Sequence, residues 1–467
     1  MIPYHARVAA FDDNPEHLRN IVNGLGRAGF WAMPFLFDAG KFEPELPKPF
    51  PGIRLVFSDI HLGPPLGSGG KVMFANAIIK GLKQVVVDGP YGLIFWSQFP
   101  GEAQSLWNEI SDRAAESGLT PPVFWGTIDK NSVMKAGEAG LDPEFDSDNL
   151  RIQILKIVND ADAISLAMSW DERVGLAAML ATNRLYKLST SAGDLAAWTK
   201  LLAYLAQEAV GKRRAEEYPV SALDNAMLPL LEDMIGNFSQ GENEHHHTIG
   251  QSITKELKSA GANLSLPAGI LAADLNTHYL IEESINKKFQ MWERGMVTEL
   301  GGGFSNSGEF VRNFDLAVDE LIEAEFILPD QRHYREKVQK LLREAKLHIV
   351  ELSAECDQVQ CKIATHRYLL ALWLPASCFE VCAKWDKKNK RFRNEFANAS
   401  IINIGEMKLK NQNESHYLLV STRRFMILPP GKKIDGKCAF RLRRTVIDEL
   451  AHHYATYSRR PGVMRFV

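Results

Sequence analysis

Five side chains that could take part in chemistry follow the short apolar runs in the first third of the chain. Three are carboxylates, one is a hydroxyl and one is an amine: Asp12, Asp13, Asp59, Ser97 and Lys130. Three carboxylates gathered in one place repel each other unless a hard cation lies between them. Mg²⁺ is such a cation, because it prefers oxygen ligands in an octahedral arrangement. The residue types therefore predict a Mg²⁺ site, provided that the fold brings these residues together.

The elements that must position these residues follow an alternating pattern. Apolar runs predict strands, and amphipathic segments between them predict helices. The predicted strands cover 7–11, 30–37, 53–58, 92–96 and 123–128, and the predicted helices cover 15–28, 72–86 and 102–116. This alternation predicts an α/β fold with a doubly wound, parallel, five-stranded sheet. Ligands of such sheets bind at the carboxyl ends of the strands, which is where the five side chains stand.

With these residues in this order, the N-terminal region resembles a response-regulator receiver domain. The motifs that carry the resemblance are Phe11-Asp12-Asp13-Asn14-Pro15, Ser58-Asp59-Ile60-His61, Ser97 and Lys130. The resemblance covers residues 5–145 and implies a flavodoxin-like fold. It also implies that Asp59 accepts a phosphoryl group from a sensor histidine kinase or a phosphotransfer protein, and that the group is later lost by hydrolysis. No enzymatic activity beyond these two steps is implied.

The same resemblance implies a role for each polar residue of the site. Asp59 would be the nucleophile that forms an aspartyl phosphate. Mg²⁺ and the Lys130 ammonium would neutralise the oxygens of the transferred phosphoryl group. Ser97 would donate its hydroxyl to a phosphate oxygen and so report phosphorylation to the helix that follows.

The resemblance also implies the set of Mg²⁺ ligands. Asp13 and Asp59 would bind the metal directly, and Asp12 would bind it directly or through water. The backbone carbonyl of His61 would complete the protein ligands. The segment 61–67 is richer in glycine and proline than is usual in receivers. This difference concerns the output face of the domain more than the phosphorylation site.

The pattern changes twice after the receiver-like region. Helical periodicity dominates residues 146–343 and predicts a mostly α-helical middle region. Residues 344–467 mix both periodicities and predict a C-terminal α+β domain. The predicted strands there are Leu347–Leu352, Tyr368–Leu374, Ser400–Ile404, Tyr417–Ser421 and Arg424–Leu428, and the predicted closing helix is Phe440–Tyr457. We therefore expect three domains, at 1–145, 146–343 and 344–467.

Three weaker motifs each allow more than one interpretation. The run Glu244–His247 could bind metal or accept phosphate, although histidines at a helix start are more often solvated. The glycine run 301–303 follows no predicted strand and lacks the residues of a P-loop, so we expect a hinge. Four cysteines could supply thiolates to Zn²⁺, with His366 as an alternative ligand, or pack as small core residues. They are Cys356, Cys361, Cys378 and Cys382, of which Cys356 could also be a nucleophile.

Charge is distributed unevenly along the chain. The 467 residues carry a formal net charge of -3. Residues 384–467 hold 19 Lys and Arg against 7 Asp and Glu, so the remainder carries -15. Aromatic residues are interleaved with the basic ones, as in surfaces that bind phosphates. We see no helix-turn-helix, zinc finger or RNP motif, so an acidic protein partner or docking onto the acidic part of this chain is preferred to nucleic acid.

Cysteine usage and hydropathy bear on the compartment. The segment Met1–Phe11 has no long apolar stretch, so no secretory signal is expected there. The longest apolar run, Tyr368–Ala376, is far shorter than the ~20 residues of a membrane-spanning helix. All five cysteines lie in the last quarter and their number is odd, which favours reduced thiols. We expect a cytoplasmic protein without a membrane segment.

Three functional hypotheses follow. The leading one is a two-component-type signalling protein in which phosphorylation of Asp59 regulates a C-terminal output or interaction module. The second is a receiver-containing scaffold or phosphate sink in a bacterial stress or phage-defence system. The third is a DNA-binding transcription regulator, which the missing recognition-helix motif disfavours.

Overall fold

The computed structural model describes most of the chain, and its internal contacts group the residues into two compact units. The described residues are 7–50, 52–63, 70–87, 89–135, 144–190, 196–240, 251–260, 264–282, 290–354, 357–358, 362–386, 388, 391–410 and 412–458. One unit comprises Met1–Leu188 with Pro229–Leu264, and the other comprises Ser189–Leu228 with Ser265–Val467. The division into three domains at residues 145 and 343 stays a prediction.

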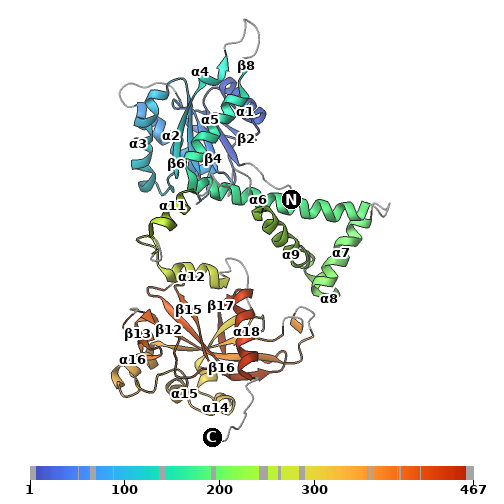
Figure 1. The fold of residues 1–467 in the computed structure, drawn as a ribbon, viewed down its shortest axis with the longest axis vertical. Helices are drawn as coiled ribbons and strands as arrows, with labels where there is room; N and C mark the ends of the chain where they lie inside the picture. Colours follow the sequence, from blue (N-terminus) through green and yellow to red (C-terminus); the bar gives the residue numbers. More distant parts are fainter. Residues whose placement is uncertain are drawn as a thin grey trace. The chain divides into compact units, whose positions relative to one another are not determined.

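The first unit contains a six-stranded, mostly parallel sheet (Figure 1). Its strand order is β3-β2-β1-β4-β5-β6. The strands are β1 (Val8–Asp12), β2 (Ala32–Asp38), β3 (Lys41–Glu43), β4 (Leu55–Ser58), β5 (Gly92–Ser97) and β6 (Phe124–Asp129). All neighbours pair in parallel except β2 and β3. The predicted parallel sheet is confirmed at this level, but the predicted number of five strands is wrong.

The additional strand β3 lies in the connection between β2 and β4. It folds back on β2 as an antiparallel edge strand after a tight turn at Ala39 and Gly40, both of which have positive φ. Phe42 on β3 packs against Phe11 of β1, with ring centroids 4.8 Å apart. This buried aromatic contact explains why a three-residue segment with charged ends adopts a strand.

Helices cover both faces of this sheet. On one face α1 (Pro15–Arg27) and α5 (Ser147–Asp160) pack on a core that includes Ile94 and Trp96 of β5. On the other face α2 (Gly70–Val85) and α3 (Ala103–Glu116) pack on a core that includes Phe11 and Phe95. Alternate residues of each strand point to opposite faces, so apolar runs without polar positions are required for a sheet buried on both sides.

Helices dominate the chain after the first sheet, as expected. They are α6 (Asp162–Thr190), α7 (Ala197–Val210), α8 (Lys212–Glu217), α9 (Pro219–Gln240), α11 (Gln251–Ala260) and α12 (Ala272–Leu280). The first half of α6 is tied to the sheet, because Asp171 accepts a hydrogen bond from Arg54 Nε at 2.9 Å. Among the described residues, no helix combines the length and the apolar character needed to cross a membrane.

The C-terminal part of the second unit is built on a seven-stranded antiparallel sheet. Its strand order is β15-β16-β12-β11-β10-β17-β9. The strands are β9 (Ile281–Glu282), β10 (Met296–Leu300), β11 (Lys346–Glu351), β12 (His366–Pro375), β15 (Ile401–Met407), β16 (His416–Leu428) and β17 (Gly436–Leu442). The predicted mixture of strands and helices is confirmed, although the sheet takes two strands from before residue 344.

Helices also flank this second sheet on both faces. One face carries α14 (Gly308–Phe314), α15 (Val318–Glu325) and α16 (Arg335–Glu344). The other carries α18 (Arg444–Ser458), whose Ile447 and Leu450 enter the core there.

Several C-terminal expectations need correction. The predicted strands Tyr417–Ser421 and Arg424–Leu428 form one strand, β16, whose pairing with β12 shifts register once. The predicted helix Phe440–Tyr457 begins only at Arg444, because 436–442 pairs with β10 as β17. A loop between two strands and a bulge within one strand both interrupt the alternation of apolar and polar residues. The sequence alone therefore does not show whether residues 417–428 form one strand or two.

The glycine run 301–303 was predicted to follow no strand, and that prediction is wrong. It follows β10 directly and opens the short helix α13 (Gly302–Ser305). Gly301 N–H donates to the backbone carbonyl of Asp435 at 2.9 Å, and Gly303 N–H donates to its carboxylate at 2.8 Å. A Cβ atom on Gly301 would collide with the Asp435 carboxylate, so close packing requires glycine there.

Acid is expected to weaken the second sheet through a buried histidine. His348 on β11 is 2 % exposed, and burial lowers its pKa from 6.5 to about 4. A lowered pKa means that the unfolded chain binds the proton more tightly, so stability falls as the pH drops below 6.5 and levels off below 4. The cost is about 3 kcal/mol over that range. Unfolding free energies of the wild type and His348→Gln across pH 4–7 measure it, and equal pH dependence of the two proteins would contradict it.

Candidate functional site

The register of the parallel strands brings the predicted polar residues to one edge of the first sheet. Phe11 on β1 lies opposite Ser58 on β4, so the residues that follow them leave the sheet side by side. Ser97, at the end of β5, lies opposite Asp129, at the end of β6. The expectation that these strand ends meet at one edge is therefore met in the structure.

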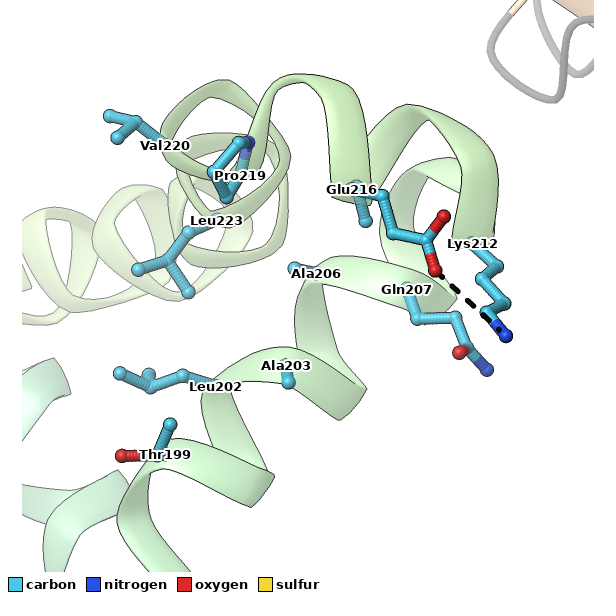
Figure 2. Close-up of a pocket in the computed structure, with 11 residues that line it drawn as sticks. Thr199, Leu202, Ala203, Ala206, Gln207, Lys212, Glu216, Pro219, Val220 and Leu223 are labelled. Atoms are coloured by element: carbon cyan, nitrogen blue, oxygen red, sulfur yellow. Dashed lines mark ion pairs between the residues drawn. The ribbon is translucent and has the colours of Figure 1, made fainter.

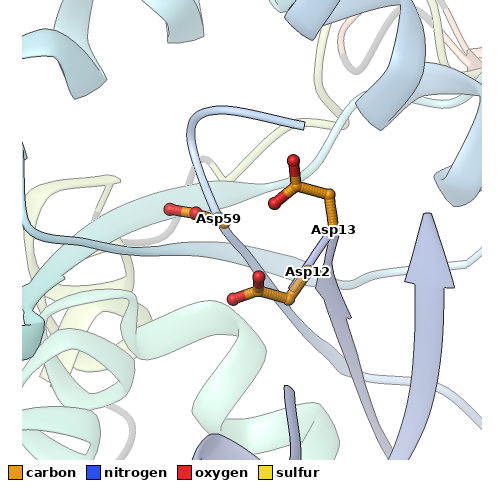
Figure 3. A group of neighbouring side chains, drawn as sticks. All are labelled: Asp12, Asp13 and Asp59. Atoms are coloured by element: carbon orange, nitrogen blue, oxygen red, sulfur yellow. The ribbon is translucent and has the colours of Figure 1, made fainter. Parts of the chain in front are cut away.

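Three carboxylates converge at this edge (Figure 3). One oxygen atom from each of Asp12, Asp13 and Asp59 lies within 4.8 Å of the others. Asp12 is fully buried, whereas Asp13 and Asp59 are partly open to solvent. In the part of the chain that the structure describes, no other group of acidic, histidine or cysteine side chains gathers in this way.

A buried lysine lies beside the cluster. Lys130, the first residue of α4 (Lys130–Val133), is 3 % exposed. Its Nζ atom lies 3.2 Å from Asp12 Oδ2 and 3.3 Å from Asp59 Oδ2. Burial raises the pKa of Asp12, the Lys130 ammonium opposes that shift, and the neighbouring Asp59 carboxylate adds to it. Two carboxylates therefore share one ammonium.

Backbone N–H groups hold the carboxylates in place. Asp13 Oδ2 accepts a hydrogen bond from Gly63 N–H at 3.0 Å, and Asp59 Oδ1 accepts one from Ile60 N–H at 2.8 Å. These contacts orient the acids without neutralising them. The site is therefore preorganised while keeping its negative charge.

The donor set fits a hard divalent cation. Three carboxylates and one ammonium leave a formal charge of about -2, which one divalent ion would balance. All of the side-chain donors are carboxylate oxygens, the ligands that Mg²⁺ prefers over softer metals. The residues present therefore suit the Mg²⁺ that the sequence led us to expect.

The other two predicted residues lie in local networks beside the cluster. Ser97 is 1 % exposed, and its Oγ atom accepts a hydrogen bond from Phe99 N–H at 3.1 Å. The His61 Nε2 atom lies 3.0 Å from Glu102 Oε2, and the imidazole packs against the rings of Phe74 and Phe99. The ligand role of the His61 backbone carbonyl stays a prediction.

The sequence did not predict that Phe74, Phe99 and Glu102 surround the His61 side chain. Phe99 and Glu102 lie at the turn before α3, and Phe74 lies in the first turns of α2. A Phe-Pro-Gly-Glu turn directly after the strand that ends in Ser97 was the available signal, because such turns reverse the chain over the strand end.

No family model, curated protein or solved structure matches this chain. What the structure supports is a mostly parallel N-terminal sheet whose acidic cluster is compatible with a receiver-like fold.

The two described cysteines of the hypothetical zinc set are core residues. Cys378 and Cys382 are both buried beside Phe379 in the core of the second sheet. Burial raises the pKa of both thiols, which disfavours the thiolate form that binds metal. Cys356, Cys361 and the run 244–247 lie outside the described residues.

Part of the basic C-terminal region is paired within its own unit. Arg393 lies 3.1 Å from Asp386, and Arg441 lies 3.6 Å from Glu282. Further pairs join Lys384 to Glu395, Arg441 to Glu293 and Arg444 to Asp448. Asp386 is buried, but the other carboxylates are partly or fully exposed, and ion pairs of that kind add little stability. All of these pairs reduce the positive charge available to a partner. Binding to nucleic acid or to an acidic partner stays a prediction.

Proposed function

We propose that this chain is a two-component-type signalling protein whose Asp59 accepts a phosphoryl group. The observation that carries the proposal is the convergence of Asp59 with Asp12, Asp13 and Lys130 at the carboxyl edge of a parallel sheet. Asp59 is partly open to solvent and can be reached by a phosphodonor. Asp12 and Lys130 are buried, and the Lys130 ammonium contacts both carboxylates.

The residues of the site divide the chemistry between them. An oxygen of Asp59 forms a bond to phosphorus, and the bond from phosphorus to the leaving group of the donor breaks. The donor is the phosphohistidine of a kinase or phosphotransfer protein, or a small acyl phosphate. Asp13 and Asp59, with Asp12, would hold Mg²⁺, which when bound supplies positive charge to the phosphoryl oxygens. The Lys130 ammonium, whose Nζ atom lies 3.3 Å from Asp59 Oδ2, supplies a second positive charge.

The response to phosphorylation would begin at Ser97. Its hydroxyl currently accepts the Phe99 N–H, and donating to a phosphate oxygen would reorient it. Phe99 also packs on His61, which pairs with Glu102, so a shift of this turn would reach the start of α3. The added charge of about two units at this edge would then alter what the helical and C-terminal parts bind.

Phosphorylation by a small donor tests the proposal. We expect the full chain, incubated with Mg²⁺ and acetyl phosphate, to gain the mass of one phosphoryl group. We expect no gain in Asp59→Ala or when a chelator removes Mg²⁺, because the nucleophile or the charge that neutralises the transferred group is then missing. Intact-protein mass spectrometry measures the gain.

A matched control is available on a neighbouring strand. Asp38 ends β2 and is exposed, so Asp38→Ala removes a carboxylate from the same sheet outside the cluster. This variant should be phosphorylated like the wild type. Absence of a gain in the wild type, or an undiminished gain in Asp59→Ala, would refute the proposed function.

A further inference from the structure

Strand β16 of the second sheet has a free edge at residues 425–428. Residues 425–428 pair with β12 on one side, but the strand on the other side, β15, pairs only with residues 416–421. Among the described residues, no strand lies beside 425–428 on that side, and no backbone group outside the sheet bonds to them. Alternate residues of a strand direct their N–H and C=O groups to opposite sides. Half of the backbone groups of the free edge therefore point away from β12 without a strand to pair with.

Apolar side chains of the free edge are open to solvent. Phe425 is 39 % exposed and Ile427 is 48 % exposed. Their register with β12 places both on the face that α18 covers, where the ring of Tyr454 lies 6.0 Å from that of Phe425. The alternate residues, Met426 and Leu428, are buried on the opposite face. The edge thus combines unpaired backbone groups with an apolar strip, the two features that allow an extended chain to add to a sheet.

The charges around the free edge are mainly positive. Arg423 and Arg424 precede it, are partly exposed and share one buried carboxylate, that of Glu325. Arg367 lies opposite Ile427 on β12, and no carboxylate of the described residues pairs with it. Three guanidinium groups therefore stand against one carboxylate, and this surplus favours an acidic ligand.

We propose that the free edge of β16 binds an extended acidic segment of another protein, which adds to the sheet as a further strand. The backbone of the segment would pair with the outward groups of 425–428 and supply affinity. Its apolar side chains would pack beside Phe425 and Ile427, and its acidic side chains would lie near the three arginines. This proposal does not depend on phosphorylation of Asp59.

Other occupants fit the free edge less well. A second copy of this chain would bring the same arginines to both sides of the interface, where like charges oppose association. Nucleic acid would meet the positive charge, but its backbone lacks the alternating donors and acceptors that pair with a strand. An acidic peptide satisfies both the charges and the unpaired backbone groups.

Binding of a synthetic peptide to the full chain tests the proposal. The probe is a short peptide of alternating valine and glutamate with blocked ends, and the comparison probe carries lysine in place of glutamate. We expect the acidic probe to bind at micromolar concentration by fluorescence anisotropy, and the lysine probe to bind at least about tenfold more weakly. The acidic probe should also slow hydrogen exchange of amides at 425–428, because an added strand gives them hydrogen-bond partners.

A substitution on the free edge provides the second arm of the test. Ile427→Glu should weaken binding of the acidic probe by roughly tenfold or more, because its carboxylate would lie beside Arg367 and repel the probe. Since Ile427 is exposed, this change should leave the fold intact, which circular dichroism checks. Val220→Glu is the matched control. It adds the same charge at an exposed valine that lines the groove between α7 and α9 (Figure 2).

Each outcome bears on the proposal. Binding that Ile427→Glu weakens, that Val220→Glu leaves unchanged and that slows exchange at 425–428 supports it. A wild type that does not bind the acidic probe would overturn it, including the case in which the chain itself covers the edge. Binding without slower exchange at 425–428 would also overturn it, because the peptide would then lie elsewhere. Tighter binding of oligothymidylate than of the acidic probe at this edge would overturn it in favour of nucleic acid.

Discussion

Replacing Lys130 with methionine is expected to slow phosphoryl transfer to Asp59 by about 100-fold or more, because the ammonium offsets charge that develops on the phosphoryl oxygens. Methionine retains most of the volume of the lysine stem in a side chain that is only 4 % exposed. The affinity of the site for Mg²⁺ should increase in the same variant. The ammonium repels a cation at the cluster, and its removal leaves Asp12 and Asp59 with uncompensated charge.

The opposed changes distinguish a catalytic role of Lys130 from a structural one. Initial rates with acetyl phosphate at saturating Mg²⁺ measure the transfer, and calorimetric titration of the unphosphorylated protein measures Mg²⁺ affinity. A misfolded site would lose both. Lys83→Met, which removes an exposed lysine from α2, is the control and should alter neither. Equal transfer rates in the wild type and Lys130→Met would exclude the assigned role.

Replacing Glu325 with alanine is expected to destabilise the second sheet and its helices by about 3–5 kcal/mol. Glu325 ends α15 with a fully buried carboxylate. It accepts hydrogen bonds from Ser421 Oγ at 2.7 Å and from Arg423 Nε at 2.8 Å, and Arg424 Nε lies 3.6 Å away. Its loss would leave two neighbouring guanidinium groups without their shared anion. Hydrogen exchange of β16 amides, followed by mass spectrometry, reports the stability of this region.

The control for this prediction lies on the same helix. Glu323 is partly exposed and pairs with an Arg335 side chain that is 70 % exposed, at 3.3 Å. Screening by solvent makes such a pair worth less than about 1 kcal/mol, so Glu323→Ala should change exchange little. Comparable exchange in the two variants would show that the buried carboxylate contributes no more than a surface pair.

The part of the site that could be predicted depends on short-range rules. Apolar runs ending in Asp12, Asp59 and Ser97 indicate strands that finish at one edge, and parallel pairing then brings those ends together. The acidic cluster and the position of Lys130 beside it follow from the same rule. No long-range contact had to be guessed beyond the strand order.

The parts that could not be predicted depend on tertiary contacts. Strand β3 is stabilised by the contact between Phe42 and Phe11, and the local sequence pattern does not indicate that contact. The pairing of His61 with Glu102 joins residues 41 positions apart across a turn. The sequence predicted a hinge at 301–303 because the residue that requires glycine at 301, Asp435, lies far along the chain. Each of these misses concerns a contact between segments distant in sequence.

Phosphorylation of Asp59 is tested most directly by locating the phosphoryl group on the chain. Borohydride reduction of the phosphorylated protein converts an aspartyl phosphate to homoserine, and peptide mass spectrometry then identifies the converted residue. We expect homoserine at position 59, formed only when Mg²⁺ is present during phosphorylation. Conversion at another residue, or no conversion of a protein that remains folded and is supplied with Mg²⁺ and donor, would contradict it.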